Sequence, residues 1–208
     1  MKRIIVILIV FVFAYKAQSQ VALDSLLVKY YDLATTSKDN NLYTEKFFEI
    51  FPDNFQLFDS IYGWHEIGDS LYLHPLYFEA GEHIDFFFDL FNTMDKSGFV
   101  KKVINISLNG HYAVDAVNIF KHLMTELLLN NTEQFLKELA LYTDTEIKSF
   151  WHFFFDNLIF DHPYCLKKHV EVYEKVKRVN RRILILMQEQ YCDDFNEYLK
   201  HEYDWDNN

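Results

Sequence analysis

Apolar side chains recur every three or four residues along most of this chain, which is the spacing of one face of an α-helix. The first such stripe after the N-terminal segment consists of Leu23, Leu26, Leu27, Tyr30 and Ala34. Only five glycines and three prolines interrupt the 208 residues, so the regular elements must be long and the connections short. Alternation of the strand type is nowhere sustained. The sequence therefore predicts an all-α fold.

The helices are expected to follow one another as antiparallel pairs, residues 99–109 with 112–129 and residues 132–142 with 144–157. Thr143 and Glu146 have the spacing of a capping box at the start of one of these helices. Residues 64–75 are the least periodic and predict a loop with short extended pieces. We expect a helical bundle with solenoid-like stacking in its middle and a long C-terminal helix that begins at Pro163.

The N-terminal segment has the pattern of a secretory leader. A basic start precedes an apolar run over residues 4–15, which is too short for a bilayer span of about 20 helical residues. Ala17 and Ser19 place small side chains at −3 and −1 of a cut after Ser19. We therefore expect residues 1–19 to be removed. One all-α domain, residues 20–208 with a short acidic tail, would remain in the periplasm or outside the cell, with no membrane span.

The charge balance narrows the choice of partner. The chain has 20 Lys and Arg against 31 Asp and Glu, a net charge of −11. Removal of Lys2, Arg3 and Lys16 with the leader leaves 17 against 31, a net charge of −14. Such acidity disfavours nucleic acid and anionic membranes as partners, suits a basic partner, and keeps the chain soluble.

The last predicted helix is unusually basic for so acidic a chain. Seven cations lie within 16 positions: Lys167, Lys168, Lys175, Lys177, Arg178, Arg181 and Arg182. These side chains can pair with carboxylates of neighbouring helices or meet an anionic surface outside the protein. We expect internal pairing, because the rest of the chain is acidic.

His162, Cys165 and His169 stand at i, i+3 and i+7, so one helical face could present three metal ligands. The same stripe, however, continues at the same spacing as far as Gln190, which is the pattern of a packing seam. Structural zinc needs four ligands and catalytic zinc needs three and a water, and the remaining ligands are not nearby in sequence. We predict no metal site and no cofactor.

The two cysteines are Cys165 and Cys192, 27 residues apart. On one continuous helix they would be separated by roughly 40 Å, whereas a disulfide needs Cα atoms within about 7 Å. A bridge would require the chain to fold back near Asn180, where no glycine or proline offers a hinge. We expect unpaired thiols.

A catalytic interpretation depends on His111, Asp115 and His122, which with Asn118 follow one another at helical spacings of 4, 3 and 4. They could present an acid–base or metal-binding line. The alternative, which we favour, is that Asp115 lies in a first helical turn, where the helix dipole favours a carboxylate, and that the others form a solvated flank. No G-x-S-x-G, H-E-x-x-H, P-loop, G-x-G-x-x-G or C-x-x-C motif is present.

Aromatic residues dominate the run FWHFFFDN that begins at Phe150. Such a run can line an aromatic ligand pocket or form the central helix of a core. We expect the core.

Several aromatic-rich segments, in order, resemble a group of small exported helical proteins of Gram-negative bacteria: FFEIFPDNFQLFDSIYGW, HPLYFEAGEHIDFFF, KKVINISLNGHYAVDAVNIFKHLM and SFWHFFFDN. The resemblance spans roughly residues 45–160. Most members of that group have no assigned function, and some look like immunity proteins that guard against toxins from neighbouring cells. The resemblance brings no catalytic residue.

These observations favour a non-enzymatic protein-binding module, most concretely an immunity or inhibitor protein that neutralises a partner toxin by occlusion. Asp204, Trp205 and Asp206 in the acidic tail are the predicted binding residues, because a tryptophan is a frequent anchor at interfaces. The alternatives are an exported hydrolase-like enzyme that uses the His/Asp set and a structural protein of the envelope.

Overall fold

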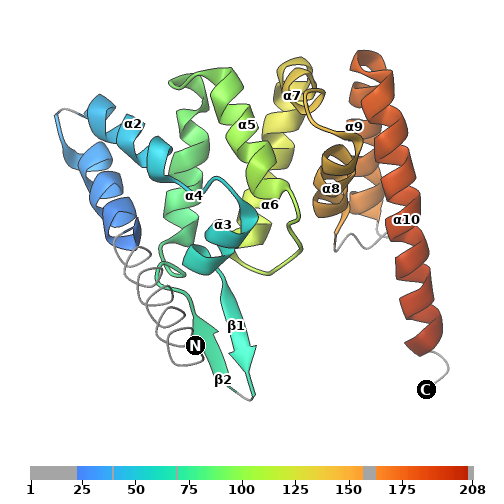
Figure 1. The fold of residues 1–208 in the computed structure, drawn as a ribbon, viewed down its shortest axis with the longest axis horizontal. Coiled ribbons are helices and arrows are strands. Elements are labelled where there is room, and N and C mark those ends of the chain that lie inside the picture. The colour runs from blue at the N-terminus through green and yellow to red at the C-terminus, as the bar shows by residue number, and fades with distance from the viewer. Residues whose placement is uncertain (1–22, 39, 69, 157–162, 206–208) are drawn as a thin grey trace, which may run out of the picture. The chain divides into compact units, whose positions relative to one another are not determined.

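The structure is a computed structural model that describes residues 23–38, 40–68, 70–156 and 163–205, without the side chains of residues 163–166 and 201–205. The predicted leader, residues 1–19, lies outside the described residues. The described elements are helices apart from one two-stranded hairpin, which confirms the all-α prediction (Figure 1). Over the same residues, no helix combines the length and the apolar character that a membrane span requires. The chain divides into two compact units, residues 1–51 and 52–208.

The first unit contains a helical segment, residues 23–36, and α2 (Asn40–Ile50). Aromatic contacts join the two helices. The Tyr30 and Tyr43 rings stack with centroids 6.4 Å apart, and the Tyr31 ring lies 6.2 Å from the Phe47 ring. The predicted apolar stripe of this segment thus supplies one side of a helix pair.

The second unit begins with α3 (Phe55–Tyr62), the hairpin strands β1 (Trp64–Ile67) and β2 (Ser70–Leu73), and α4 (Ala80–Asp89), which a 3₁₀ turn, η1 (Leu90–Asn92), extends. The remaining helices are α5 (Lys96–Ser107), α6 (Ala116–Asn130), α7 (Thr132–Leu139), α8 (Asp144–Phe155), α9 (Pro163–Val179) and α10 (Arg181–Trp205). The predicted capping box is present at the start of α8, where Thr143 and Glu146 exchange side-chain-to-backbone hydrogen bonds.

Helices of the second unit stack in an alternating order. The principal contacts join α4 with α6, α5 with α7, α7 with α9 and α8 with α10, and α6 also packs on α7 (Figure 1). The predicted helix pairs follow one another along the chain, but most of their contacts are with the next helix but one. This arrangement resembles the stacking predicted for the middle of the chain.

Aromatic rings fill the centre of the stack. Phe120 of α6 is fully buried, and its ring contacts Phe58 of α3 at 5.2 Å, Phe88 of α4 at 5.4 Å and Phe153 of α8 at 6.4 Å between centroids. All five Phe and Trp residues between 150 and 155 are buried, as predicted for a central helix: Phe150, Trp151, Phe153, Phe154 and Phe155. The remaining position of that run is His152.

The predicted single helix from Pro163 onwards is wrong, although α10 confirms a long C-terminal helix. Asn180 lies between the end of α9 and the start of α10. Its backbone N–H donates to the Val176 carbonyl at 3.0 Å, and its side-chain oxygen accepts from the Ile183 N–H at 3.1 Å. The rings of His169 and Tyr191, each eleven residues from Asn180, stack with centroids 4.0 Å apart. The chain therefore folds back at an asparagine, a residue that caps helices well.

The reversal removes the distance argument against a disulfide, because the two cysteines no longer lie on one helix. Cys192 is nevertheless a free, exposed thiol. The side chain of Cys165 lies outside the described residues.

The hairpin occupies the stretch that was predicted as a loop with short extended pieces. β1 and β2 are antiparallel, with Trp64 opposite Leu73 and Ile67 opposite Ser70. Gly68 in the connecting turn has φ of +62°, a conformation that glycine adopts without steric cost. Each strand has only four residues, too few for a clear alternating pattern in the sequence.

Candidate functional site

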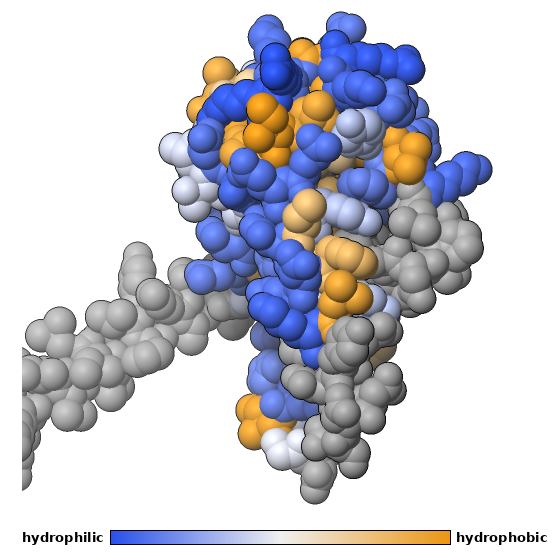
Figure 2. Space-filling model, turned by 90° about the vertical axis from the view of Figure 1, so that its right-hand side faces the viewer, coloured by the Kyte–Doolittle hydropathy of each residue, from blue (hydrophilic) through white to orange (hydrophobic). Residues whose placement is uncertain are grey.

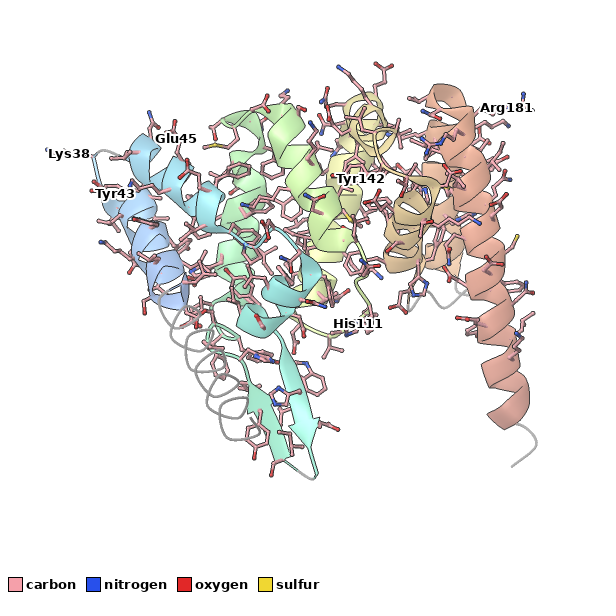
Figure 3. All side chains as sticks on the ribbon, in the orientation of Figure 1. Lys38, Tyr43, Glu45, His111, Tyr142 and Arg181 are labelled. Atoms are coloured by element: carbon pink, nitrogen blue, oxygen red, sulfur yellow. The ribbon has the colours of Figure 1, made fainter. Side chains whose placement is uncertain are left out.

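The structure does not bring the predicted catalytic set His111, Asp115 and His122 together. Helix α6 begins only at Ala116, so the first two residues lie in the preceding loop and do not share its face (Figure 3). The His111 ring packs on Phe55 with centroids 4.8 Å apart. Asp115 accepts a hydrogen bond from the Tyr77 hydroxyl, and His122 is exposed on α6.

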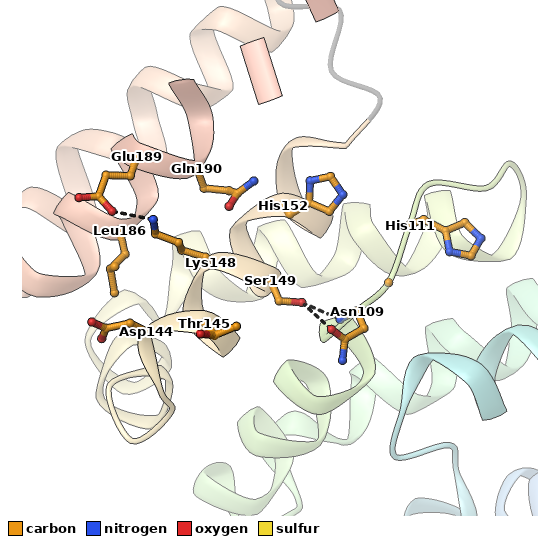
Figure 4. Close-up of a pocket in the computed structure, with 11 residues that line it drawn as sticks. Asn109, His111, Asp144, Thr145, Lys148, Ser149, His152, Leu186, Glu189 and Gln190 are labelled. Carbon is orange, nitrogen blue, oxygen red and sulfur yellow. Dashed lines mark hydrogen bonds and ion pairs between the residues drawn. The ribbon is translucent and has the colours of Figure 1, made fainter. Parts of the chain in front are cut away.

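An open groove of about 810 Å³ lies between the α5–α6 loop, α8 and α10 (Figure 4). Polar side chains line most of it, and His111 stands at one end. The residues around it are Asn109, Gly110, His111, Asp144, Thr145, Lys148, Ser149, His152, Leu186, Glu189 and Gln190.

His152 and Asp194 form the main polar contact beneath this groove. The His152 Nδ1 lies 2.8 Å from the Asp194 Oδ1, which also accepts from the Gln190 Nε2 at 2.9 Å. The Asp194 side chain is 9% exposed and the His152 side chain 43%. The hydrogen bond to Asp194 raises the pKa of His152, partial burial opposes that rise, and the charges of Asp194, Asp156 and Glu197 add to it.

We expect this ion pair to make stability depend on pH. A histidine whose folded pKa lies above its unfolded value of about 6.5 stabilises the fold fully below that value, and loses this contribution as the pH rises through the folded pKa. Urea unfolding between about pH 5.5 and 8 should show this decline. In His152→Gln the decline should be smaller, whereas the exposed His122→Gln should keep it. An unchanged profile in His152→Gln would contradict the ion pair.

Lys121 lies on α6 beside the end of α8. Its Nζ donates to the Asp156 carbonyl at 2.6 Å and lies 5.2 Å from the centre of the Phe153 ring. Burial lowers the pKa of Lys121 to about 8, against the opposing charges of Asp156 and Asp194. The Asp156 carboxylate also accepts the Tyr112 backbone N–H. Asp156 thus ties the α5–α6 loop and α6 to the end of α8.

Four of the other polar residues that line the groove are engaged with one another in two pairs. The Asn109 backbone N–H donates to the Ser149 hydroxyl at 2.7 Å, and Lys148 pairs with Glu189 at 2.8 Å (Figure 4). The Ser149 hydroxyl therefore helps hold the α5–α6 loop. In chemical terms the groove offers one oriented imidazole, that of His152, as a proton donor or acceptor.

The pairing of His152 with Asp194 could not be predicted from the sequence. His152 and Asp194 are 42 residues apart and lie on different helices. The one local signal was a single imidazole within an otherwise aromatic buried run, and its partner could not be chosen among the many carboxylates of the chain.

Several residues of the basic segment pair internally, as expected. Lys168 pairs with Glu126 at 3.0 Å, and Lys175 donates to the Leu129 carbonyl. Arg182 contacts the α7–α8 connection through four hydrogen bonds, to the carbonyls of Ala140 and Tyr142 and twice to Asp144. Arg181, in contrast, projects away from the helices at the start of α10 (Figure 3).

The possible metal ligands of α9 are only partly described. His162 and the side chain of Cys165 lie outside the described residues. His169 belongs to an aromatic stack, between Tyr191 at 4.0 Å and Phe155 at 5.4 Å, and burial lowers its pKa. Within the described part of the chain, no three His, Cys, Asp or Glu residues gather as metal ligands would.

Two of the predicted binding residues, Asp204 and Trp205, lie at the end of α10. The backbone is helical as far as Trp205, so part of the acidic tail continues the helix. The side chains of Asp204 and Trp205, and all of Asp206, lie outside the described residues, and their role stays a prediction. The face of the molecule on which α10 lies is mostly hydrophilic, with scattered apolar side chains (Figure 2).

The hairpin carries exposed apolar side chains that the sequence analysis did not single out. Ile67, Leu71, Tyr72 and Leu73, which we name the hairpin surface, are exposed by 58%, 57%, 48% and 40%. In the register of the hairpin, Leu71 and Leu73 lie on one face of the sheet, and Ile67 and Tyr72 lie on the other. The Tyr72 ring stacks on that of His65, with centroids 5.5 Å apart. Backbone hydrogen bonds from His74 to the Gly63 carbonyl and from Leu76 to the Ile61 carbonyl hold the base of the hairpin to α3.

Comparisons with protein-family models, curated proteins and solved structures found no match. The resemblance to exported immunity-like proteins therefore stays an expectation from the sequence.

Proposed function

We propose that this chain is a protein-binding module of the periplasm or cell exterior, and that the hairpin surface is its principal contact. The carrying observation is the exposure of Ile67, Leu71, Tyr72 and Leu73 on two short strands. Leu71 and Leu73 are neighbours on one face of the hairpin, and Ile67 and Tyr72 lie on the other. Neighbouring exposed apolar side chains mark interaction sites more often than scattered ones, and leaving four of them in water is unfavourable.

The apolar hairpin and the net charge of the chain indicate what kind of partner would bind. The contact would be apolar at the hairpin, and the net charge of −11 favours a partner with a basic surface around it. A module of this kind acts by covering a surface of its partner. An immunity or inhibitor protein that occludes a toxin is the most concrete form of this proposal.

A second candidate is an exported enzyme, favoured by the oriented imidazole of His152 in the groove. It would use His152 with Asp194 and not the predicted His111, Asp115 and His122, which have separate surroundings. A His152→Ala variant that still protects cells against the partner would speak for binding. Loss of that protection with binding intact would speak for the enzyme.

The neighbouring genes provide the test of the proposal. A large toxin-like gene beside the gene for this chain supplies the probe, and the purified product is titrated with this protein. We expect Leu71→Asp with Leu73→Asp to raise the Kd at least about tenfold, the size of an interface hot spot, and to abolish protection in a growth assay. Leu141→Asp, at a leucine 70% exposed elsewhere, is the control. Undiminished binding by the double variant would exclude the face of the hairpin that carries Leu71 and Leu73, and absence of any binding would reject the function.

A further inference from the structure

Two histidines meet on one face of the hairpin. His65 of β1 lies opposite Tyr72, and His74 directly follows β2, so these three side chains point to the same face of the sheet. The Nδ1 of His65 lies 3.2 Å from the Nε2 of His74, and the ring centroids are 5.1 Å apart. His65 is exposed and His74 is half-buried, so small solutes can reach the pair.

The surrounding residues hold the two rings in place. The Tyr72 ring stacks on the His65 ring with centroids 5.5 Å apart and planes at 11°. The His74 N–H donates to the Gly63 carbonyl at 3.1 Å, and the following Pro75 restricts the His74 backbone to extended conformations. The two imidazoles therefore lie side by side before any ligand binds, which lowers the cost of ordering them on binding.

The spacing of the two nitrogens fits one kind of ligand. Zinc binds imidazole nitrogens at about 2.0–2.1 Å in tetrahedral geometry, which places two such nitrogens about 3.3–3.4 Å apart. The observed distance is 3.2 Å. Neighbouring ligands in the square plane preferred by Cu²⁺ would be about 2.8 Å apart at the same bond length. Mg²⁺ and Ca²⁺ prefer oxygen ligands. Distance and donor type therefore both favour zinc.

We propose that the Nδ1 of His65 and the Nε2 of His74 bind one Zn²⁺ ion. The two rings tilt so that both lone pairs converge on the metal. Because zinc binds neutral imidazole, the ring that donated the hydrogen bond carries its proton on its other nitrogen. Zinc is almost always four-coordinate in such sites, so water or a donor of another molecule fills the two remaining positions.

The prediction of no metal site considered the possible ligands of α9, where helical spacing suggested a common face. His65 and His74 are nine residues apart, and only the pairing of the two strands brings them together. With two protein ligands the site is smaller than the groups of three or more that are absent from the described part of the chain.

The zinc site does not depend on the proposed function. It lies on the face of the hairpin opposite Leu71 and Leu73. The double variant Leu71→Asp with Leu73→Asp should therefore bind zinc as tightly as the parent chain, whatever its effect on a protein partner. The two proposals can consequently fail separately.

Isothermal titration with zinc chloride tests the site. The full chain is purified without a histidine tag and carries Cys165→Ser and Cys192→Ser, which remove the thiol ligands. We expect one zinc per chain, with a Kd that rises at least about tenfold in either His65→Gln or His74→Gln. The matched control is His122→Gln, at an exposed histidine on α6, which should leave the Kd unchanged. Magnesium chloride should give no binding.

Three outcomes would reject the zinc site. They are no saturable binding up to about 1 mM zinc, binding that both hairpin variants leave intact, and binding that His162→Gln abolishes while the hairpin variants retain it. The last result would place the metal at the start of α9. Circular dichroism of each variant shows whether the helices remain folded.

Discussion

Phe120→Ala should lower the free energy of unfolding by about 3–5 kcal/mol, the cost of removing a buried ring and leaving a cavity. We expect this loss to be among the largest for a single substitution in this chain. Phe120 has no exposed surface, and its ring contacts aromatic side chains of α3, α4 and α8. Guanidinium unfolding followed by circular dichroism gives the measurement.

The matched control for this prediction is Phe78→Ala, because Phe78 is 82% exposed. An exposed substitution of this kind should change stability by no more than about 0.5 kcal/mol. A loss below about 1 kcal/mol in Phe120→Ala would mean that the ring does not occupy the centre of the helix stack.

Gly110→Ala should cost about 1–3 kcal/mol, the usual penalty for overpacking. A Cβ atom at Gly110 would lie 2.6 Å from the Cδ2 of Phe153 and 2.8 Å from the Cδ2 of Phe55, closer than real Cβ contacts. Both rings are buried, so neither can move aside easily. Thermal and guanidinium unfolding of the variant measure the effect.

Gly81→Ala serves as the control for the glycine substitution. A Cβ there would meet only the Cδ1 of Ile119, at an ordinary 3.8 Å, and Gly81 lies in α4, where alanine is favoured over glycine by about 0.5–1 kcal/mol. We expect this variant to be as stable as the wild type or more so. Equal stability of the two alanine variants would show that the α5–α6 loop does not approach α8 as closely as described.

Local signals in the sequence predicted the helical class and several details of it. The capping box of Thr143 and Glu146 and the buried aromatic run from Phe150 depend on residues within one helix, where spacing alone carries the information. The sequence analysis considered a fold-back near Asn180 and disfavoured it, because the apolar seam continues across this residue and no glycine or proline marks it. Helix capping by the asparagine side chain sets the turn.

The candidate surfaces were harder to predict, because both depend on contacts between distant elements. His152 meets Asp194 only through the packing of α8 on α10. The hairpin strands are four residues long, so their alternation could not be separated from a loop. His111 and Asp115 had the spacing of a helical face, but α6 begins after them.

The alternating helix contacts have a consequence for how the second unit folds. α4 packs on α6, α5 on α7, and α8 on α10. In each of these pairs a single helix separates the two partners along the chain. Contacts of short sequence separation close small loops, and proteins built from them fold fast. The stack can therefore assemble by successive addition of neighbouring helices, with no pairing of the two ends of the unit required.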